Sequence, residues 1–126
     1  MFFFDENIGP NIVKGFHEFG EDVTHLLDHF DPGTPDEEWL EFVGKNRMVL
    51  ITQDRRIRNR PIERQALFIH RVGAFILYGK DLGRWARVKQ IVTAWPRIKE
   101  FSQQTNPPYA FSVSTAGKSI KRIHLP

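Results

Sequence analysis

Three aspartates stand where neighbouring strands of a predicted sheet would end. Asp5 directly follows the apolar run 2–4, Asp54 comes two residues after the apolar run 48–52, and Asp36 lies in the first turn of a predicted helix that leads into the second run. Because such a helix begins at the carboxyl end of its strand, we expect all three acids at one edge of a parallel sheet. Converging carboxylates resist ionisation unless a cation is present. Hard oxygen ligands, in a chain without cysteine, favour Mg²⁺ or Mn²⁺. Such an ion activates water and neutralises a phosphodiester, so Asp5, Asp36 and Asp54 are candidate metal ligands and catalytic residues.

Each acid alone has an ordinary structural explanation. Asp36 favours the N-terminus of its helix by charge. Thr34-Pro35-Asp36-Glu37 has the pattern of a capping box with proline at the first helical position, which accounts for Glu37. Asp5 and Asp54 are typical turn residues after strands. The placement of all three at one predicted edge favours the functional interpretation.

A dense group of arginines begins immediately after Asp54. Guanidinium groups bind phosphate in a bidentate manner, so a basic loop beside an acid cluster would hold an RNA backbone. The alternatives are a solvated charged loop or a surface that binds an acidic partner protein. Lys80, after a later strand, faces the same predicted edge. The candidate phosphate-binding arginines are Arg55, Arg56, Arg58, Arg60 and Arg64.

Other polar residues near the predicted edge are candidates for supporting roles. Asn7 and Thr52 are placed to hydrogen-bond an acid or a metal-bound water, although Asn in a turn and Thr on a strand are also ordinary. His25 and His29 have the H-x-x-x-H spacing of a helical zinc site, but they lie in a predicted strand or turn and lack the adjacent Glu of a metalloprotease. We therefore do not expect zinc there.

The net charge of +3 conceals a strong asymmetry. Residues 1–54 contain 12 acidic and 3 basic side chains, whereas residues 55–126 contain 15 basic and 3 acidic ones. This split predicts a polyanionic partner, or a homodimer in which opposite faces meet. The absence of cysteine excludes disulfides and thiolate metal sites and is compatible with a reducing cytoplasm. No apolar run is long enough to span a membrane, and no signal peptide is evident.

Apolar patterning predicts one α/β domain over residues 1–126. Continuous apolar runs indicate buried parallel strands, and amphipathic segments between them indicate helices. Pro96 should break or kink the helix predicted over 82–104. Strands are expected at 2–4, 22–26, 48–52 and 74–78, followed by a hairpin of 109–113 with 119–123; helices are expected to begin at 10, 35, 61 and 82. This order implies a three-layer α/β/α sandwich with a mainly parallel sheet and a C-terminal β-hairpin.

The chain resembles the PIN-like nuclease domain, and within it the compact group of VapC-type toxins. The resemblance rests on Phe4-Asp5-Glu6-Asn7, Gly33-Thr34-Pro35-Asp36 and Ile51-Thr52-Gln53-Asp54-Arg55-Arg56, in that order, and extends over nearly the whole chain. It implies an endoribonuclease in which Asp5, Asp36 and Asp54 bind Mg²⁺ or Mn²⁺. It also implies a cognate antitoxin as a protein partner.

One motif of that family has no counterpart here. Typical members carry another acid, usually Glu, on a helix between the first two acids, and this chain offers Glu6 or Glu63 as replacements. Two alternatives to a nuclease therefore stay open. One is a receiver-like signalling domain, which also has acids at strand ends; the other is a non-catalytic PIN-like module that binds RNA or protein.

Overall fold

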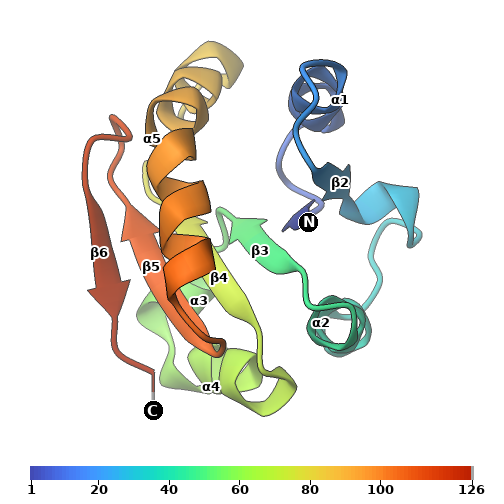
Figure 1. The fold of residues 1–126 in the computed structure, drawn as a ribbon. Helices are drawn as coiled ribbons and strands as arrows, with labels where there is room; N and C mark the ends of the chain where they lie inside the picture. The colour runs from blue at the N-terminus through green and yellow to red at the C-terminus, as the bar shows by residue number, and fades with distance from the viewer. Residues whose placement is uncertain (126) are drawn as a thin grey trace.

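The computed structural model describes residues 1–125, and of Arg58 the backbone only. Its centre is a six-stranded sheet of order β2-β1-β3-β4-β5-β6, in which every pairing is parallel except that of β5 with β6 (Figure 1). The strands are β1 (Phe2–Phe4), β2 (Val23–His25), β3 (Val49–Thr52), β4 (Gly73–Leu77), β5 (Tyr109–Val113) and β6 (Ile120–Ile123). The helices are α1 (Pro10–Glu18), α2 (Asp36–Lys45), α3 (Arg55–Asn59), α4 (Pro61–His70) and α5 (Arg84–Gln104), with a 3₁₀ turn η1 (Leu26–Asp28).

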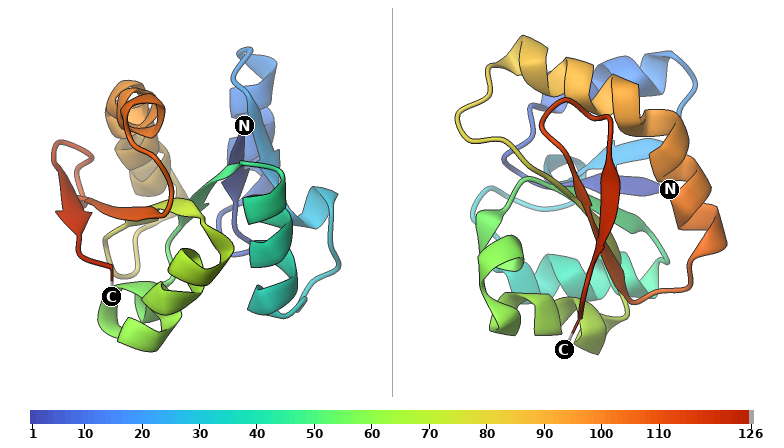
Figure 2. Two further views of the ribbon diagram at one scale, coloured as in Figure 1. Left: turned by 60° about the horizontal axis from the view of Figure 1, so that its bottom comes forward. Right: turned by 90° about the vertical axis from the view of Figure 1, so that its left-hand side faces the viewer.

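Helices cover both faces of the sheet, as predicted (Figure 2). Alternate residues of β1 point to opposite sides. Phe2 and Phe4 enter a core shared with α1 and α5, and Phe3 enters a second core shared with α2, α3 and α4. In the first core the ring of Trp95 on α5 lies 4.8 Å from that of Phe2 and 6.1 Å from that of Phe4. The three-layer α/β/α architecture and the closing antiparallel hairpin are both confirmed.

The start of α2 differs from the predicted capping box. The helix begins at Asp36, and Pro35 is its N-cap, without a side-chain hydrogen bond. The hydroxyl of Thr34 donates instead to the backbone carbonyl of Asp31 at 2.7 Å, and Glu37 contacts Nε2 of His70 at 2.9 Å. The prediction was wrong because a Thr hydroxyl can also donate to a preceding backbone carbonyl in a turn. Thr34 makes that bond and does not cap the helix.

Pro96 does not end its helix. α5 runs unbroken from Arg84 to Gln104 and bends along its length (Figure 2), so of the two expectations for Pro96 the break was wrong. Pro96 is exposed between Trp95 and Ile98, which are both buried in the core. Packing of these neighbours holds the helix together, and the missing backbone hydrogen bond lies on the solvent side, where water can replace it.

A buried polar pair on α5 fastens the carboxyl ends of β4 and β5. Nη1 of Arg87 donates to the carbonyl of Tyr78 at 3.1 Å and to Oε1 of Gln90 at 2.6 Å. The amide of Gln90 donates to the carbonyls of Tyr78 at 2.8 Å and Ser114 at 3.0 Å. These bonds satisfy carbonyl groups just after β4 and β5 that the sheet leaves unpaired. They hold in place the carboxyl ends of these two strands.

In the part of the chain that the structure describes, none of the helices has the length and apolar character needed to cross a membrane.

Candidate functional site

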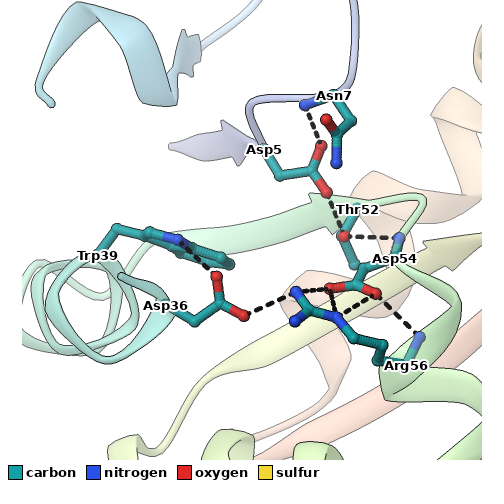
Figure 3. A network of polar contacts seen from close by, with 7 residues as sticks. All are labelled: Asp5, Asn7, Asp36, Trp39, Thr52, Asp54 and Arg56. Carbon is teal, nitrogen blue, oxygen red and sulfur yellow. Dashed lines mark hydrogen bonds and ion pairs between the residues drawn. The ribbon is translucent and has the colours of Figure 1, made fainter. Parts of the chain in front are cut away.

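The three predicted acids line one pocket at the carboxyl edge of the sheet. Asp5 follows β1, Asp54 follows β3, and Asp36 opens α2, which leads into β3. The pocket has a volume of about 490 Å³. Its polar lining includes Asp5, Glu6, Asp36, Trp39, Asp54 and Arg56, and we call it the acid pocket. Figure 3 shows most of these side chains with their contacts.

Asp5 is the buried acid of the pocket, with only 4% of its surface exposed. Its carboxylate accepts a hydrogen bond from the hydroxyl of Thr52 and another from the backbone N–H of Asn7 at 3.1 Å. Burial raises the pKa of Asp5 to about 6, although these hydrogen bonds oppose the rise. Asp5 is thus held rigidly by neutral donors.

Asp36 and Asp54 are joined by the guanidinium of Arg56 (Figure 3). Nη2 of Arg56 lies 3.0 Å from Oδ2 of Asp36 and 2.8 Å from Oδ2 of Asp54, while its Nε lies 3.1 Å from both oxygens of Asp54. Burial acts to raise the pKa of Asp54, but the hydrogen bonds and charge of Arg56 outweigh it and hold that pKa below its usual value. Hydrogen bonds to Asp54 raise the pKa of Arg56 in turn. The structure therefore places a positive charge between two of the three acids.

Local structure explains how Asp54 reaches this position. Asp54 is the N-cap of α3, and its carboxylate accepts from the backbone N–H of Arg56 at 2.9 Å. Its own N–H donates to the hydroxyl of Thr52 at 3.0 Å. One threonine thus connects Asp5 with the turn that carries Asp54.

Trp39 contributes to the acid pocket in a way that the sequence patterns did not predict. Its indole Nε1 donates to Oδ1 of Asp36 at 3.2 Å, although its ring belongs to the core beside Phe3. The signal was present in the spacing, because residues three apart on a helix lie on the same side. Trp39 therefore fixes the carboxylate that Arg56 approaches from the other side.

The predicted supporting residues fall into different places. Glu6 lines the acid pocket, but its Oε1 accepts from the backbone N–H of Gly33 at 2.9 Å and so holds the loop before α2. Asn7 supports Asp5 through its backbone rather than its side chain. Glu63, on α4, is not among the residues that line the acid pocket; its charge acts on Arg56 from a distance.

The predicted basic loop is instead the short helix α3 followed directly by α4, and its arginines diverge. Arg64 turns inward, with Nη1 donating to the carbonyl of Ile57 at 3.3 Å. Arg55 and Lys80 line a neighbouring small pocket at the same edge of the sheet. Arg60 is exposed and contributes to the low pKa of Asp54. The side chain of Arg58 lies outside the described residues.

His25 and His29, the two histidines with the spacing of a zinc site, make structural contacts instead. Nε2 of His25 lies 2.7 Å from the carbonyl of Ile8, and Nε2 of His29 lies 2.8 Å from the hydroxyl of Thr24. Each ring nitrogen at these contacts is thus engaged with the protein itself.

Comparison with protein families gives a match to a PIN-like domain over residues 1–79. The chain belongs to the PIN-like domain family. The matched segment contains the complete lining of the acid pocket. No curated protein and no solved structure matches the chain. Membership supports a nuclease-type fold and favours it over the receiver-like alternative.

The donor chemistry of the acid pocket fits the divalent metal that this fold implies. Its acids supply hard carboxylate oxygens, and the chain has no thiolate to compete for the ion. In residues 1–125 no three acidic or histidine side chains converge closely enough to hold an ion together. Mg²⁺ is commonly bound through one or two carboxylates, with waters and substrate phosphate completing its shell. The acid pocket fits that mode of binding, with Arg56 as the cation now in contact with two of its acids.

Proposed function

We propose that this PIN-like domain is an endoribonuclease that uses Mg²⁺ or Mn²⁺ at the acid pocket. The observation that carries the proposal is the common placement of Asp5, Asp36 and Asp54 around one pocket at the carboxyl ends of β1 and β3. Open parallel sheets bind ligands at this edge. Family membership supports the same class of chemistry.

One or two of the carboxylates of Asp5, Asp36 and Asp54 would hold the metal, with Glu6 at the same pocket and with waters and substrate phosphate completing its shell. A bound divalent cation supplies an activated water and stabilises charge on the scissile phosphate. Thr52 and Asn7 orient Asp5, and Trp39 orients Asp36. Arg55, Arg60 and Lys80 lie exposed or at a pocket along the same edge, where they would hold the RNA backbone.

Substitution of the acids tests the proposal. Asp5→Asn and Asp54→Asn should each reduce cleavage of labelled single-stranded RNA by at least about a hundredfold, because each removes a charged ligand. Asp31→Asn is the matched control, since Asp31 is exposed and does not line the acid pocket. Wild-type cleavage should stop when EDTA is added and resume with excess Mn²⁺. Full activity of both acid variants would refute the assignment.

One observation favours a second candidate, a non-catalytic PIN-like module. The single positive charge of Arg56 is shared by Asp36 and Asp54, so these two acids are held together without a metal. A module of this kind would bind RNA equally well in EDTA and in Mn²⁺ and would leave it intact. An enzyme would cleave RNA only with the metal present.

We also propose that the domain acts as the toxin of a toxin–antitoxin pair. The basis is the resemblance of its motifs to VapC-type toxins together with its family membership. A cognate antitoxin would cover the acid pocket. Induced expression should arrest growth, the Asp5→Asn variant should not, and co-expression of the protein from the neighbouring reading frame should restore growth.

A further inference from the structure

The side chain of Arg56, which the sequence predicted to bind RNA phosphate, lies between two acids of the acid pocket. Its guanidinium makes hydrogen bonds to the carboxylates of both Asp36 and Asp54, within a pocket whose acids would also bind a divalent cation. A guanidinium and a metal ion compete for the same carboxylate oxygens, because each needs their lone pairs and negative charge.

The contact of Arg56 with Asp36 and Asp54 is also one that a metal ion could replace. The side chain of Arg56 remains 50% exposed, and that of Asp36 40% exposed, so the guanidinium can leave the carboxylates without opening the core. Arg56 extends from α3, a helix of five residues at the rim of the pocket. A released guanidinium would stay at the mouth of the pocket, where a phosphate bound to the metal-loaded carboxylates would be its strongest available partner.

We propose that Arg56 is the resident cation of the acid pocket: it holds Asp36 and Asp54 in the metal-free protein and transfers to substrate phosphate when a divalent cation is bound. This inference rests on the proposed function, because it requires a metal at these acids. It assigns Arg56 as a positioning residue that keeps the acids charged and close before the metal arrives. It also makes metal binding and release of Arg56 a single coupled event.

Metal titration without RNA tests the competition. Mn²⁺ binding would be measured by calorimetry and by the electron spin resonance signal of free Mn²⁺, for wild type, Arg56→Ala and Arg56→Lys. Arg56→Ala should bind Mn²⁺ roughly three- to tenfold more tightly, since it removes a partly exposed competing cation. Arg56→Lys should fall between the two, because one ammonium cannot reproduce the forked contact. Arg84→Ala, which removes an exposed arginine outside the acid pocket, should match wild type and so control for net charge.

A spectroscopic measurement follows Arg56 directly. The ¹⁵N–¹H signal of its Nε–H, assigned by its loss in Arg56→Lys, should shift when diamagnetic Mg²⁺ saturates the wild-type protein. In Asp54→Asn the signal should already resemble that of a free guanidinium before Mg²⁺ is added. If Arg56→Ala fails to fold, Arg56→Lys and this signal still carry the test.

The possible outcomes separate the two proposals. If Mn²⁺ binds wild type and Arg56→Ala equally, or binds Arg56→Ala more weakly, Arg56 does not compete with the metal and this inference is overturned while the nuclease proposal stands. An unchanged Arg56 signal at saturating Mg²⁺ has the same meaning. If Mn²⁺ binds none of these proteins, the metal-dependent function itself fails, and the inference fails with it.

Discussion

The hydroxyl of Thr52 donates a hydrogen bond to the buried carboxylate of Asp5, and these two residues lie at the ends of adjacent parallel strands. The same hydroxyl oxygen accepts from the backbone N–H of Asp54. Thr52 is completely buried, so neither contact can be replaced by bulk water. One side chain therefore sets the spacing between the acid after β1 and the acid after β3.

Replacing Thr52 by Val should destabilise the protein. The variant keeps the shape of the side chain but leaves Asp5 and the N–H of Asp54 without their partner, which costs about 1–3 kcal/mol of unfolding free energy. Urea denaturation measures the loss. Thr52→Ser, which retains the hydroxyl, should recover most of it; equal stability of the Val variant and wild type would show that the hydrogen bond contributes nothing.

Stability of the metal-free protein should fall as the pH rises through about 6 because of Asp5. Burial raises the pKa of Asp5 from 3.8 to about 6, so the folded state binds this proton more tightly than the unfolded state. The associated stability is fully present below about pH 4 and is lost as Asp5 ionises, with a total near 3 kcal/mol.

Asp5→Asn isolates this contribution, since the amide does not titrate. The difference in unfolding free energy between wild type and variant should change across pH 4–7 in EDTA and then become constant. A difference that is flat across this range would mean that the pKa of Asp5 is not raised in the folded state.

Gln90→Leu should be among the more destabilising substitutions in α5. Gln90 is completely buried, and its loss removes one of the acceptors of Arg87 and the donor to the carbonyls of Tyr78 and Ser114. We expect a cost of about 2–4 kcal/mol in thermal or urea unfolding. Lys89→Ala, at the exposed neighbouring position, should change stability by less than about 0.5 kcal/mol.

Gly73→Ala should destabilise β4 because of Tyr109. A Cβ at position 73 would lie 2.2 Å from Cζ of Tyr109, whose ring is buried on the neighbouring strand. Overpacking of this kind costs about 1–3 kcal/mol or more. Gly15→Ala is the opposite control, since a Cβ there meets nothing within 4 Å and Ala favours the helix by about 1 kcal/mol. Equal effects of the two substitutions in unfolding experiments would contradict the packing explanation.

The sequence predicted the central strands well because β1, β3 and β4 lie in nearly continuous apolar runs. The run 2–4 has both faces covered, and the burial of Phe2, Phe3 and Phe4 follows directly from that pattern. The placement of the three aspartates at one edge was also predictable, since parallel strands share their carboxyl ends.

Contacts that depend on tertiary structure were not predictable in the same way. The spacing of Arg56 from Asp54 permits the local ion pair, but Asp36 is twenty residues away and reaches Arg56 only after α2 has packed on the sheet. Thr34 had an equally good alternative partner in the preceding turn. Arg56 contacts both Asp54 and Asp36, whereas Thr34 contacts the preceding turn and not the helix. In each case the folded backbone decides which chemically reasonable partners are near.

The packing of Trp95 has a consequence for how the chain folds during its synthesis. The rings of Phe2, Phe4 and Phe16 all lie against Trp95, at centroid distances of 4.8, 6.1 and 5.1 Å. Every residue that lines the acid pocket precedes position 57, so all of them leave the ribosome well before Trp95 does. Until then β1, the strand that Asp5 follows, lacks the helix that packs on Phe2 and Phe4. A nascent chain thus contains all the acids of the acid pocket long before it contains the tryptophan that packs against β1.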